Sequence, residues 1–223
     1  TPLKLENYKK RQIHFKGVEV VDDAGEVMVY FSAKNKRSDH EFYFVKIDSD
    51  GTYNKEVNLT KTLDRNLTDA SCSKIDEDTY IFTGTYSERN SIVSEGIYFI
   101  KLVNNELETV KYHNYLDLDN FTDYLSERKQ NRIERKKKNK KERGKELKIS
   151  YYMASHKIIS TDDGYMYLGE AFYPTYRTET YTTTTTTNGQ TTTTTRTRTV
   201  FDGFQYTHAV LCKFNPHGEI VWD

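Results

Sequence analysis

The chain has 223 residues, enough to bury a real core in one large or two small domains. Lysine plus arginine and aspartate plus glutamate each number 33, and this balance argues against a chain-wide attraction to nucleic acid or anionic lipid. No apolar run approaches the roughly 18 residues of a membrane helix, and no signal peptide opens the chain. With 18 Tyr, 11 Phe and only 3 Pro, the composition favours half-buried strands, so we expect a mainly β protein.

Two cysteines, Cys72 and Cys212, are too few for a disulfide framework or a zinc cluster. We expect both to be small buried side chains, and the sequence leaves open whether they meet. The chain begins at Thr1 rather than at Met and stops midway through an expected strand. We therefore expect a fragment of a larger protein, or an open array that a partner completes.

Short stretches of alternating polar and apolar residues, separated by turn residues, begin at Val18 and predict strands. Residues 1–14 are polar and basic and indicate at most a lead-in strand. The stretches form three groups of four, as in an antiparallel meander. The first group covers 17–23, 26–34, 41–51 and 52–60, the second 71–78, 79–88, 96–106 and 107–115, and the third 156–164, 165–176, 207–218 and 219–223.

The third strands of the three groups align on a shared lysine, found at positions 46, 101 and 213. A repeat of about 50 residues with four strands per unit is typical of a β-propeller blade. We therefore predict antiparallel four-stranded repeats of β-propeller type in a single domain, with about three blades at 15–62, 69–115 and 150–223. Propellers have about four to eight blades, so three blades form an incomplete ring.

Two pairs of segments carry a resemblance to known proteins. The strand–turn–strand segments KIDSDG (46–51) and CKFNPHGEIVW (212–222) resemble the degenerate blades of bacterial secreted propellers. The segments GEAFYPTYRT (169–178) and YTHAVLCKFNPHGEIVWD (206–223) are similar to an uncharacterised family of exported proteins of the Bacteroidota. The resemblance covers most of residues 70–223 through structural motifs. It implies a periplasmic, cell-surface or secreted location and supplies no catalytic residue.

A charged insertion at 118–148 separates the second and third repeats. Residues 127–148 hold twelve Lys/Arg and four Glu, a net charge of +8, so the rest of the chain sums to −8. We predict a helix over 119–148, capped by Asp119 or Asn120. Two roles for this segment stay open. We favour a solvated insertion, and the alternative is the binding of phosphate, an acidic glycan or an anionic membrane surface. The lack of stacking aromatics argues against nucleic acid.

A long hairpin arm is predicted over 172–205, because Asn188–Gly189 is the strongest short signal for a type I′ turn. This turn fixes a register in which paired residue numbers sum to 377. That register places Glu179 opposite Arg198, Arg177 opposite Val200, Tyr173 opposite Phe204 and Ala171 opposite Tyr206. The arm is far longer than a blade, so it must project. We expect its threonine tip, which has neither a core nor a third strand, to be mobile or to need a partner.

Threonines fill the tip of the arm on both sides of the turn. Their β-branched side chains favour strands, while their hydroxyls keep both faces hydrated. Such an array can also match ice or sugar hydroxyls or accept O-linked glycans. We favour a structural arm or an assembly contact.

The densest cluster of aromatic and ionisable residues lies at the base of the arm. We take as candidate binding residues Glu170, Tyr173, Tyr176, Arg177, Asp202, Tyr206 and His208. Exposed tyrosines with a few charges suit carbohydrate or protein contact, although packing between blades is the commonest reason for such a cluster. The predicted register separates Glu170 and Asp202 on opposite faces, which argues against a catalytic pair for glycosidic bonds. We expect His208 to be a core histidine, and the histidines show no metal spacing.

These features predict a non-catalytic scaffold or binding module of an exported bacterial protein, with protein–protein contacts through the arm. The alternative is part of a carbohydrate-active or other enzyme whose catalytic site lies outside this chain. No catalytic residue, metal site or cofactor is predicted. A protein or glycan partner is compatible with the sequence, and the ligand and the oligomeric state stay open.

Overall fold

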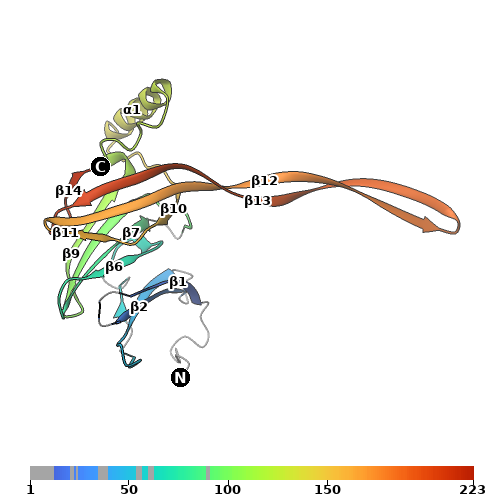
Figure 1. Ribbon diagram of the computed structural model, residues 1–223. Helices are drawn as coiled ribbons and strands as arrows, with labels where there is room; N and C mark the ends of the chain where they lie inside the picture. Colours follow the sequence, from blue (N-terminus) through green and yellow to red (C-terminus); the bar gives the residue numbers. More distant parts are fainter. Residues whose placement is uncertain are drawn as a thin grey trace.

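The computed structural model describes residues 13–20, 23, 25–34, 40–53, 57–59, 63–88 and 91–223. The protein is mainly β, with three antiparallel sheets, an α-helix standing above them and a long two-stranded arm (Figure 1). The first sheet has the order β1 (Ile13–Val20), β2 (Val27–Lys34), β3 (His40–Ile47) and β4 (Val57–Asn58). Of the expected lead-in over 1–14, residues 13 and 14 belong to β1, and residues 1–12 lie outside the described residues. Parts of the expected fourth strand over 52–60 also lie outside them.

The second and third sheets repeat the same meander order. In the second, β6 (Ser71–Lys74) and β5 (Asn66–Leu67) pair with β7 (Thr79–Ser87), followed by β8 (Gly96–Val103) and β9 (Glu106–Asn114). In the third, β10 (Tyr152–Ser155) and β11 (Ile159–Thr161) pair with β12 (Gly164–Thr187), followed by β13 (Gln190–Phe214) and β14 (Ile220–Trp222). The prediction of a mainly β chain with antiparallel repeats is confirmed at the level of three antiparallel sheets. The first sheet has the four strands predicted, whereas the second and third have five each. The short β5 and β10 were not predicted.

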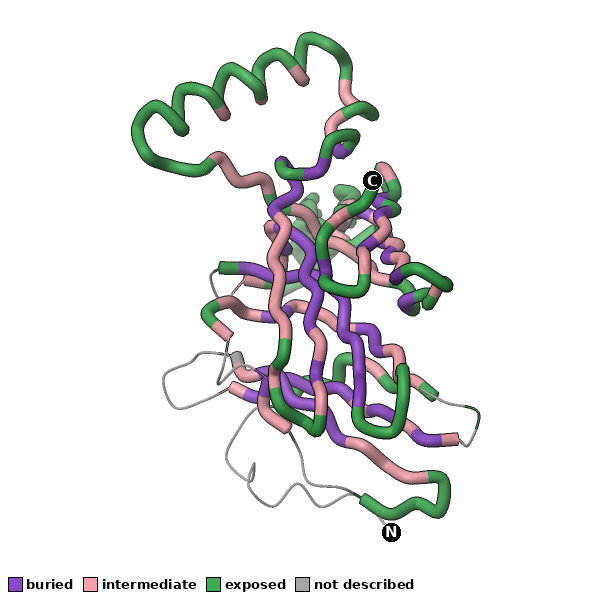
Figure 2. Tube along the Cα trace, turned by 90° about the vertical axis from the view of Figure 1, so that its left-hand side faces the viewer, coloured by how far each residue is buried: buried purple, intermediate pink, exposed green. Residues whose placement is uncertain are grey.

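The sheets pack face to face through two aromatic-rich cores. The buried residues are concentrated along the strands of the sheets (Figure 2). Between the first and second sheets, the rings of Phe44 and Phe82 lie 5.1 Å apart. Between the second and third sheets, Phe99 contacts Phe214 at 5.6 Å and Tyr165 at 5.7 Å. The second sheet is therefore buried on both faces, as the near-continuous burial of β7 and β8 requires.

Strands β1, β6 and β11, which correspond to the first strands of the three predicted repeats, also contact one another through hydrogen bonds. Glu19 of β1 accepts from the backbone N–H of Cys72 at 2.7 Å. The hydroxyls of Ser73 in β6 and Ser160 in β11 are 2.8 Å apart, and Ser71 accepts from the N–H of Ile158 at 2.8 Å. Strands β1, β6 and β11 therefore converge along a common line.

The two cysteines occupy different cores. Cys72 lies between the first and second sheets and Cys212 between the second and third, and both are buried and free. Burial raises the pKa of both thiols above the ordinary range, which keeps them protonated and unreactive. The expectation of two buried cysteines is confirmed, and they do not pair.

Helix α1 spans Glu127–Lys141, so the predicted helix over 119–148 is wrong at both ends. The N-cap is Ser126, and the preceding segment forms turns instead. Tertiary contacts decide this, because the side chain of Asp223 accepts from the N–H groups of Asp119 and Asn120 at 2.9 and 2.8 Å. Phe121 is buried in the core between the second and third sheets, which pins the turn against the body.

The packing of Phe99 provides a test of this architecture. Phe99 is fully buried between two sheets, whereas Ile92 is 80% exposed in a loop. We expect Phe99→Ala to lower the free energy of unfolding by about 3–5 kcal/mol, because it removes contacts on both sides of the interface. Ile92→Ala, the control, should change it by less than about 0.5 kcal/mol. Urea unfolding measures both, and a similar small effect of the two substitutions would contradict the packing.

Candidate functional site

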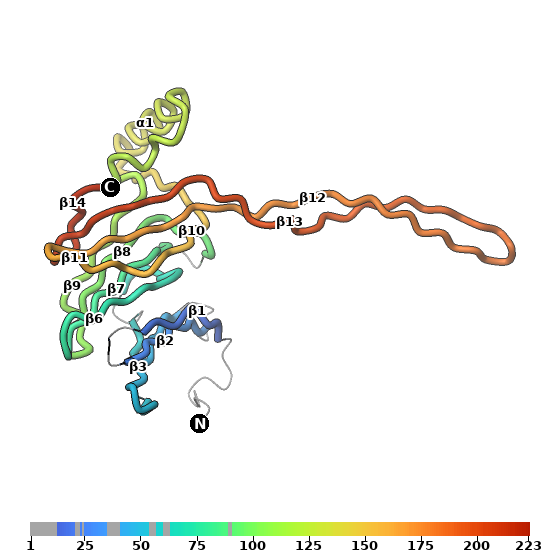
Figure 3. The backbone as a smooth tube through the Cα atoms, viewed as in Figure 1, coloured from blue at the N-terminus to red at the C-terminus, as the bar shows by residue number. Residues whose placement is uncertain are grey.

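The arm is a two-stranded ribbon that leaves the third sheet (Figure 3). Strands β12 and β13 stay paired from Tyr165–Phe214 to Thr187–Gln190. Strand β10 pairs with β12 only as far as Phe172. Strand β14 pairs with β13 only at the C-terminal end of β13, at Lys213 and Phe214. Both backbone edges of the arm are therefore free of other described strands beyond this point. At the tip, Asn188 and Gly189 have φ angles of 51° and 79°, which confirms the predicted type I′ geometry.

Two β-bulges correct the predicted register at the base of the arm. Near the tip the pairs of Glu179 with Arg198 and of Arg177 with Val200 are as predicted. An extra residue, Asp202, then enters β13, and Tyr173 pairs with Gln205 rather than with Phe204. A second extra residue, Thr207, shifts the pairing again, so Ala171 lies opposite His208 and not Tyr206. Each bulge turns the following side chains of β13 to the other face.

The bulges gather six aromatic side chains on one face of the arm base, here called the aromatic strip. The strip consists of Tyr152, Phe172, Tyr176, Phe201, Phe204 and Tyr206. Its ring centroids lie 5.1 to 5.9 Å apart in a continuous series. The strip is open to solvent, since Tyr176 is 62% exposed and Phe204 is 57% exposed.

The opposite face of the arm is charged. Arg177 and Arg198 both donate to Glu179, at 2.8 and 2.9 Å, and Arg198 lies over the ring of Tyr181. Hydrogen bonds from Arg198 and Arg177 hold the pKa of the Glu179 carboxyl below its usual range. This ion-pair group is exposed, so it contributes little to stability and mainly keeps this face hydrated.

Further out, the face that carries the aromatic strip becomes a ladder of threonines. The register pairs threonine with threonine at five successive positions of this face, namely 178–199, 180–197, 182–195, 184–193 and 186–191. Every member of the ladder is exposed. The two faces of the arm therefore differ in chemistry, one aromatic and hydroxylic, the other charged at its base.

The seven predicted site residues do not form one cluster. Tyr176 and Tyr206 belong to the aromatic strip, whereas Tyr173 and Arg177 lie on the charged face. Asp202 sits in the first bulge, 3.5 Å from Arg177. Glu170 contacts His156 at 2.9 Å. Each carboxylate thus has its own basic neighbour, and the two are not directed at a shared point.

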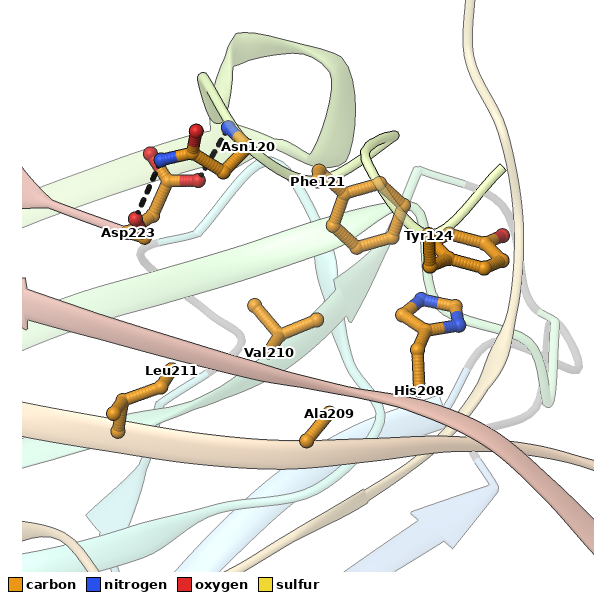
Figure 4. Close-up of a pocket in the computed structure, with 8 residues that line it drawn as sticks. All are labelled: Asn120, Phe121, Tyr124, His208, Ala209, Val210, Leu211 and Asp223. Carbon is orange, nitrogen blue, oxygen red and sulfur yellow. Dashed lines mark hydrogen bonds between the residues drawn. The ribbon is translucent and has the colours of Figure 1, made fainter. Parts of the chain in front are cut away.

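His208 lies on the inner side of β13, at the edge of a cavity of about 180 Å³ (Figure 4). Its ring stacks on Tyr124 with a centroid distance of 3.8 Å and meets the rings of Phe121 and Tyr151 edge to face at 5.3 Å. Nδ1 lies 3.0 Å from the hydroxyl of Thr207, while Nε2 is buried without a hydrogen-bond partner. Through these ring contacts with His208, the turn before α1 packs against the base of the arm.

Sequence reasoning missed part of this arrangement. Phe172, Phe201 and Phe204 were not named as site residues, and Tyr124 was not linked to His208. One signal was present, because Asp202–Gly203 inside an expected strand is typical of a bulge. Gly203 adopts φ of 132°, a conformation that other residues rarely adopt.

No protein-family model matches the chain, and searches of curated proteins and of solved structures find no match. Within the described part of the chain, no group of three or more His, Cys, Asp or Glu side chains is arranged to hold a metal ion. No helix among those residues is long and apolar enough to span a membrane.

The setting of His208 predicts a pH dependence of stability. Burial lowers the pKa of His208 below its ordinary value, so the folded protein resists protonation at this site. The unfolded chain takes up that proton at about pH 6.5, and the free energy of unfolding therefore decreases as the pH falls below that value.

Urea unfolding between about pH 7.5 and pH 5 measures this contribution. We expect a smaller loss of stability on acidification in His208→Phe, which fills the same aromatic surroundings without a titrating group. His217→Gln, a change in an exposed turn, is the control and should behave like the parent protein. Identical pH profiles for the parent and His208→Phe would show that His208 titrates freely.

Proposed function

We propose that the chain is a non-catalytic scaffold or binding module that contacts a partner protein through its arm. The observation that carries this proposal is the aromatic strip, which exposes large apolar side chains on a ribbon without a core of its own. Neighbouring exposed residues on the same face of the third sheet, Leu211 and Trp222, extend the surface. Five aromatic side chains of this surface are 42–62% exposed, namely Tyr176, Phe201, Phe204, Tyr206 and Trp222. At about 150–250 Å² per aromatic side chain, they expose roughly 400–670 Å². That area approaches the ~800 Å² per partner of a stable protein interface.

The geometry of the strip favours a protein over a glycan. A sugar ring stacks best on an aromatic face that is open and flat. In the strip, Phe172 and Phe204 meet at 81°, Tyr176 and Phe201 at 73°, and Phe201 and Phe204 at 65°. Rings at these angles present alternating edges and faces to solvent. Such an uneven surface suits the side chains of a partner protein, which can pack between the rings.

The free edges of the arm support the same proposal. An isolated two-stranded ribbon is at best marginally stable in water, because neither face is covered. Unpaired backbone groups along both edges can accept an added strand from a partner, as in β-augmentation. A protein partner would thus supply both the hydrogen bonds and the apolar cover that the arm lacks.

For the architecture, the proposal is that the three sheets are successive blades of a β-propeller type repeat. The repeat alignment supports it, since Phe44, Phe99 and Leu211 occupy equivalent positions. Phe44 faces the second sheet and Phe99 faces the third, and both are buried, whereas Leu211 is 40% exposed. Convergence of the three first strands is a second support, because the innermost strands of propeller blades line a common axis. A further sheet, from this protein or from a partner, would cover Leu211.

The setting proposed for this module is the envelope or exterior of a bacterium. The support is the sequence resemblance of residues 46–51, 169–178 and 206–223 to exported bacterial proteins. A projecting arm with an apolar strip fits an assembly contact in such a location.

Site-specific photocrosslinking tests the contact. A photoreactive benzoylphenylalanine at position 204 lies on the aromatic strip, and the same residue at position 181 lies on the charged face of the arm. We expect position 204 to give one discrete adduct in an envelope extract of the native host, identified by mass spectrometry, while position 181 gives none. Adducts that are the same from both positions, or absent from both, would overturn the proposal.

A further inference from the structure

Helix α1 is a concentrated positive surface that the arm does not explain. It contains nine Lys/Arg and two Glu in 15 residues, a net charge of +7, and none of its residues is buried. Figure 2 shows it as an exposed rod standing off one end of the sheets. A helix with so little packing gains almost nothing from the body of the protein.

The helix is nevertheless held in one orientation. Its half-buried residues are Gln130, Ile133 and Lys137, which recur at helical spacing on the side facing the body. Gln130 donates to the backbone carbonyls of Thr122 and Leu125 at 3.2 and 3.0 Å. Lys137 donates to the backbone carbonyl of Leu116 at 2.6 Å. These bonds fix which side of the helix faces outward.

The outward side is an arginine row. Arg128, Arg132 and Arg135 follow one another at spacings of four and three, so they lie on one face, opposite the anchoring residues. All three are exposed, as is Lys136 beside them. No apolar residue interrupts this face, which excludes insertion of the helix into hydrocarbon and leaves surface adsorption.

An acidic turn lies at the end of the second sheet that is remote from α1. This turn, over 76–78, lies beside the turn that precedes β9, since the carbonyl of Asp78 accepts from the N–H of Asn104. Strand β9 then runs nine residues, about 30 Å, to the end that leads into α1. This separation of charge would orient the molecule, with α1 toward an anionic plane and the acidic turn away from it.

We propose that the outward face of α1 is an electrostatic docking surface for an anionic phospholipid bilayer. A flat anionic plane can contact a projecting cationic helix along its polar outward face, and such a contact needs no groove. Between Tyr124 and Tyr151 the chain has no aromatic residue, so the stacking that single-stranded nucleic acids use is missing. Clusters of four to eight cations on a helix are typical of peripheral binding to anionic lipid.

Vesicle co-sedimentation of the whole chain tests this inference. The probes are phosphatidylcholine vesicles with about one third phosphatidylglycerol, and neutral phosphatidylcholine vesicles. The test variant carries Arg128→Gln, Arg132→Gln and Arg135→Gln, which keeps helix propensity while it removes three charges. The matched control removes three arginines from the arm, with Arg177→Gln, Arg196→Gln and Arg198→Gln.

We expect the parent chain to bind the anionic vesicles and not the neutral ones. It should be released when the salt concentration rises from about 0.05 M to about 0.5 M. The α1 variant should bind about 100-fold more weakly, while the arm control binds like the parent. The proposal is overturned if the parent ignores anionic vesicles, or if binding survives high salt. It is equally overturned if both variants lose the same affinity, or if the parent binds duplex DNA or heparin but not vesicles.

Discussion

The structure depends on one constraint, which is that a sheet with two apolar faces can bury them only against other sheets. The second sheet shows this most fully, since Phe82 faces the first sheet and Phe99 faces the third. Fixing Phe214 against Phe99 fixes the position of β13 and hence the origin of the arm. The outer face of the third sheet is left with exposed apolar residues, and the aromatic strip continues from that face.

The arm begins where this core ends. Ala171 and Val210 are the last buried residues of β12 and β13, and the bulge at Thr207 follows at once. From there the ribbon is held by backbone pairing, by the stacked rings of the strip and by exposed ion pairs. His208 connects this transition to the turn before α1, so the base of the arm is anchored from the inside while its outer face stays open.

The sequence predicted the features that local chemistry controls. Alternation located the principal strands, and Asn188–Gly189 set the pairing of the outer arm. The base of the arm was not predicted correctly, because a one-residue bulge inverts every side chain beyond it, and the bulges at Asp202 and Thr207 place Phe204 and Tyr206 on the strip. The start of α1 was also missed, because contacts remote in sequence fix the segment before it. These contacts are the hydrogen bonds to Asp223, more than 100 residues away, and the burial of Phe121 in the core.

The arm and the helix offer two surfaces of distinct chemistry. The arm presents a relief of aromatic rings and a threonine ladder on one face, while α1 presents a row of arginines at another site. We propose that the sheets hold these two surfaces at fixed positions, so that the module joins a partner protein to a location at the bacterial envelope.

Hydroxyl-radical footprinting of the native assembly tests the proposed protein contact most directly, because it reports the exposure of individual side chains. In the isolated chain, Phe201, Phe204 and Leu211 should be oxidised readily. In the native assembly we predict that all three are protected, while Tyr181 on the charged face stays as reactive as before. Unchanged oxidation of the strip and of Leu211 in the assembly would contradict both the protein contact and the covering sheet.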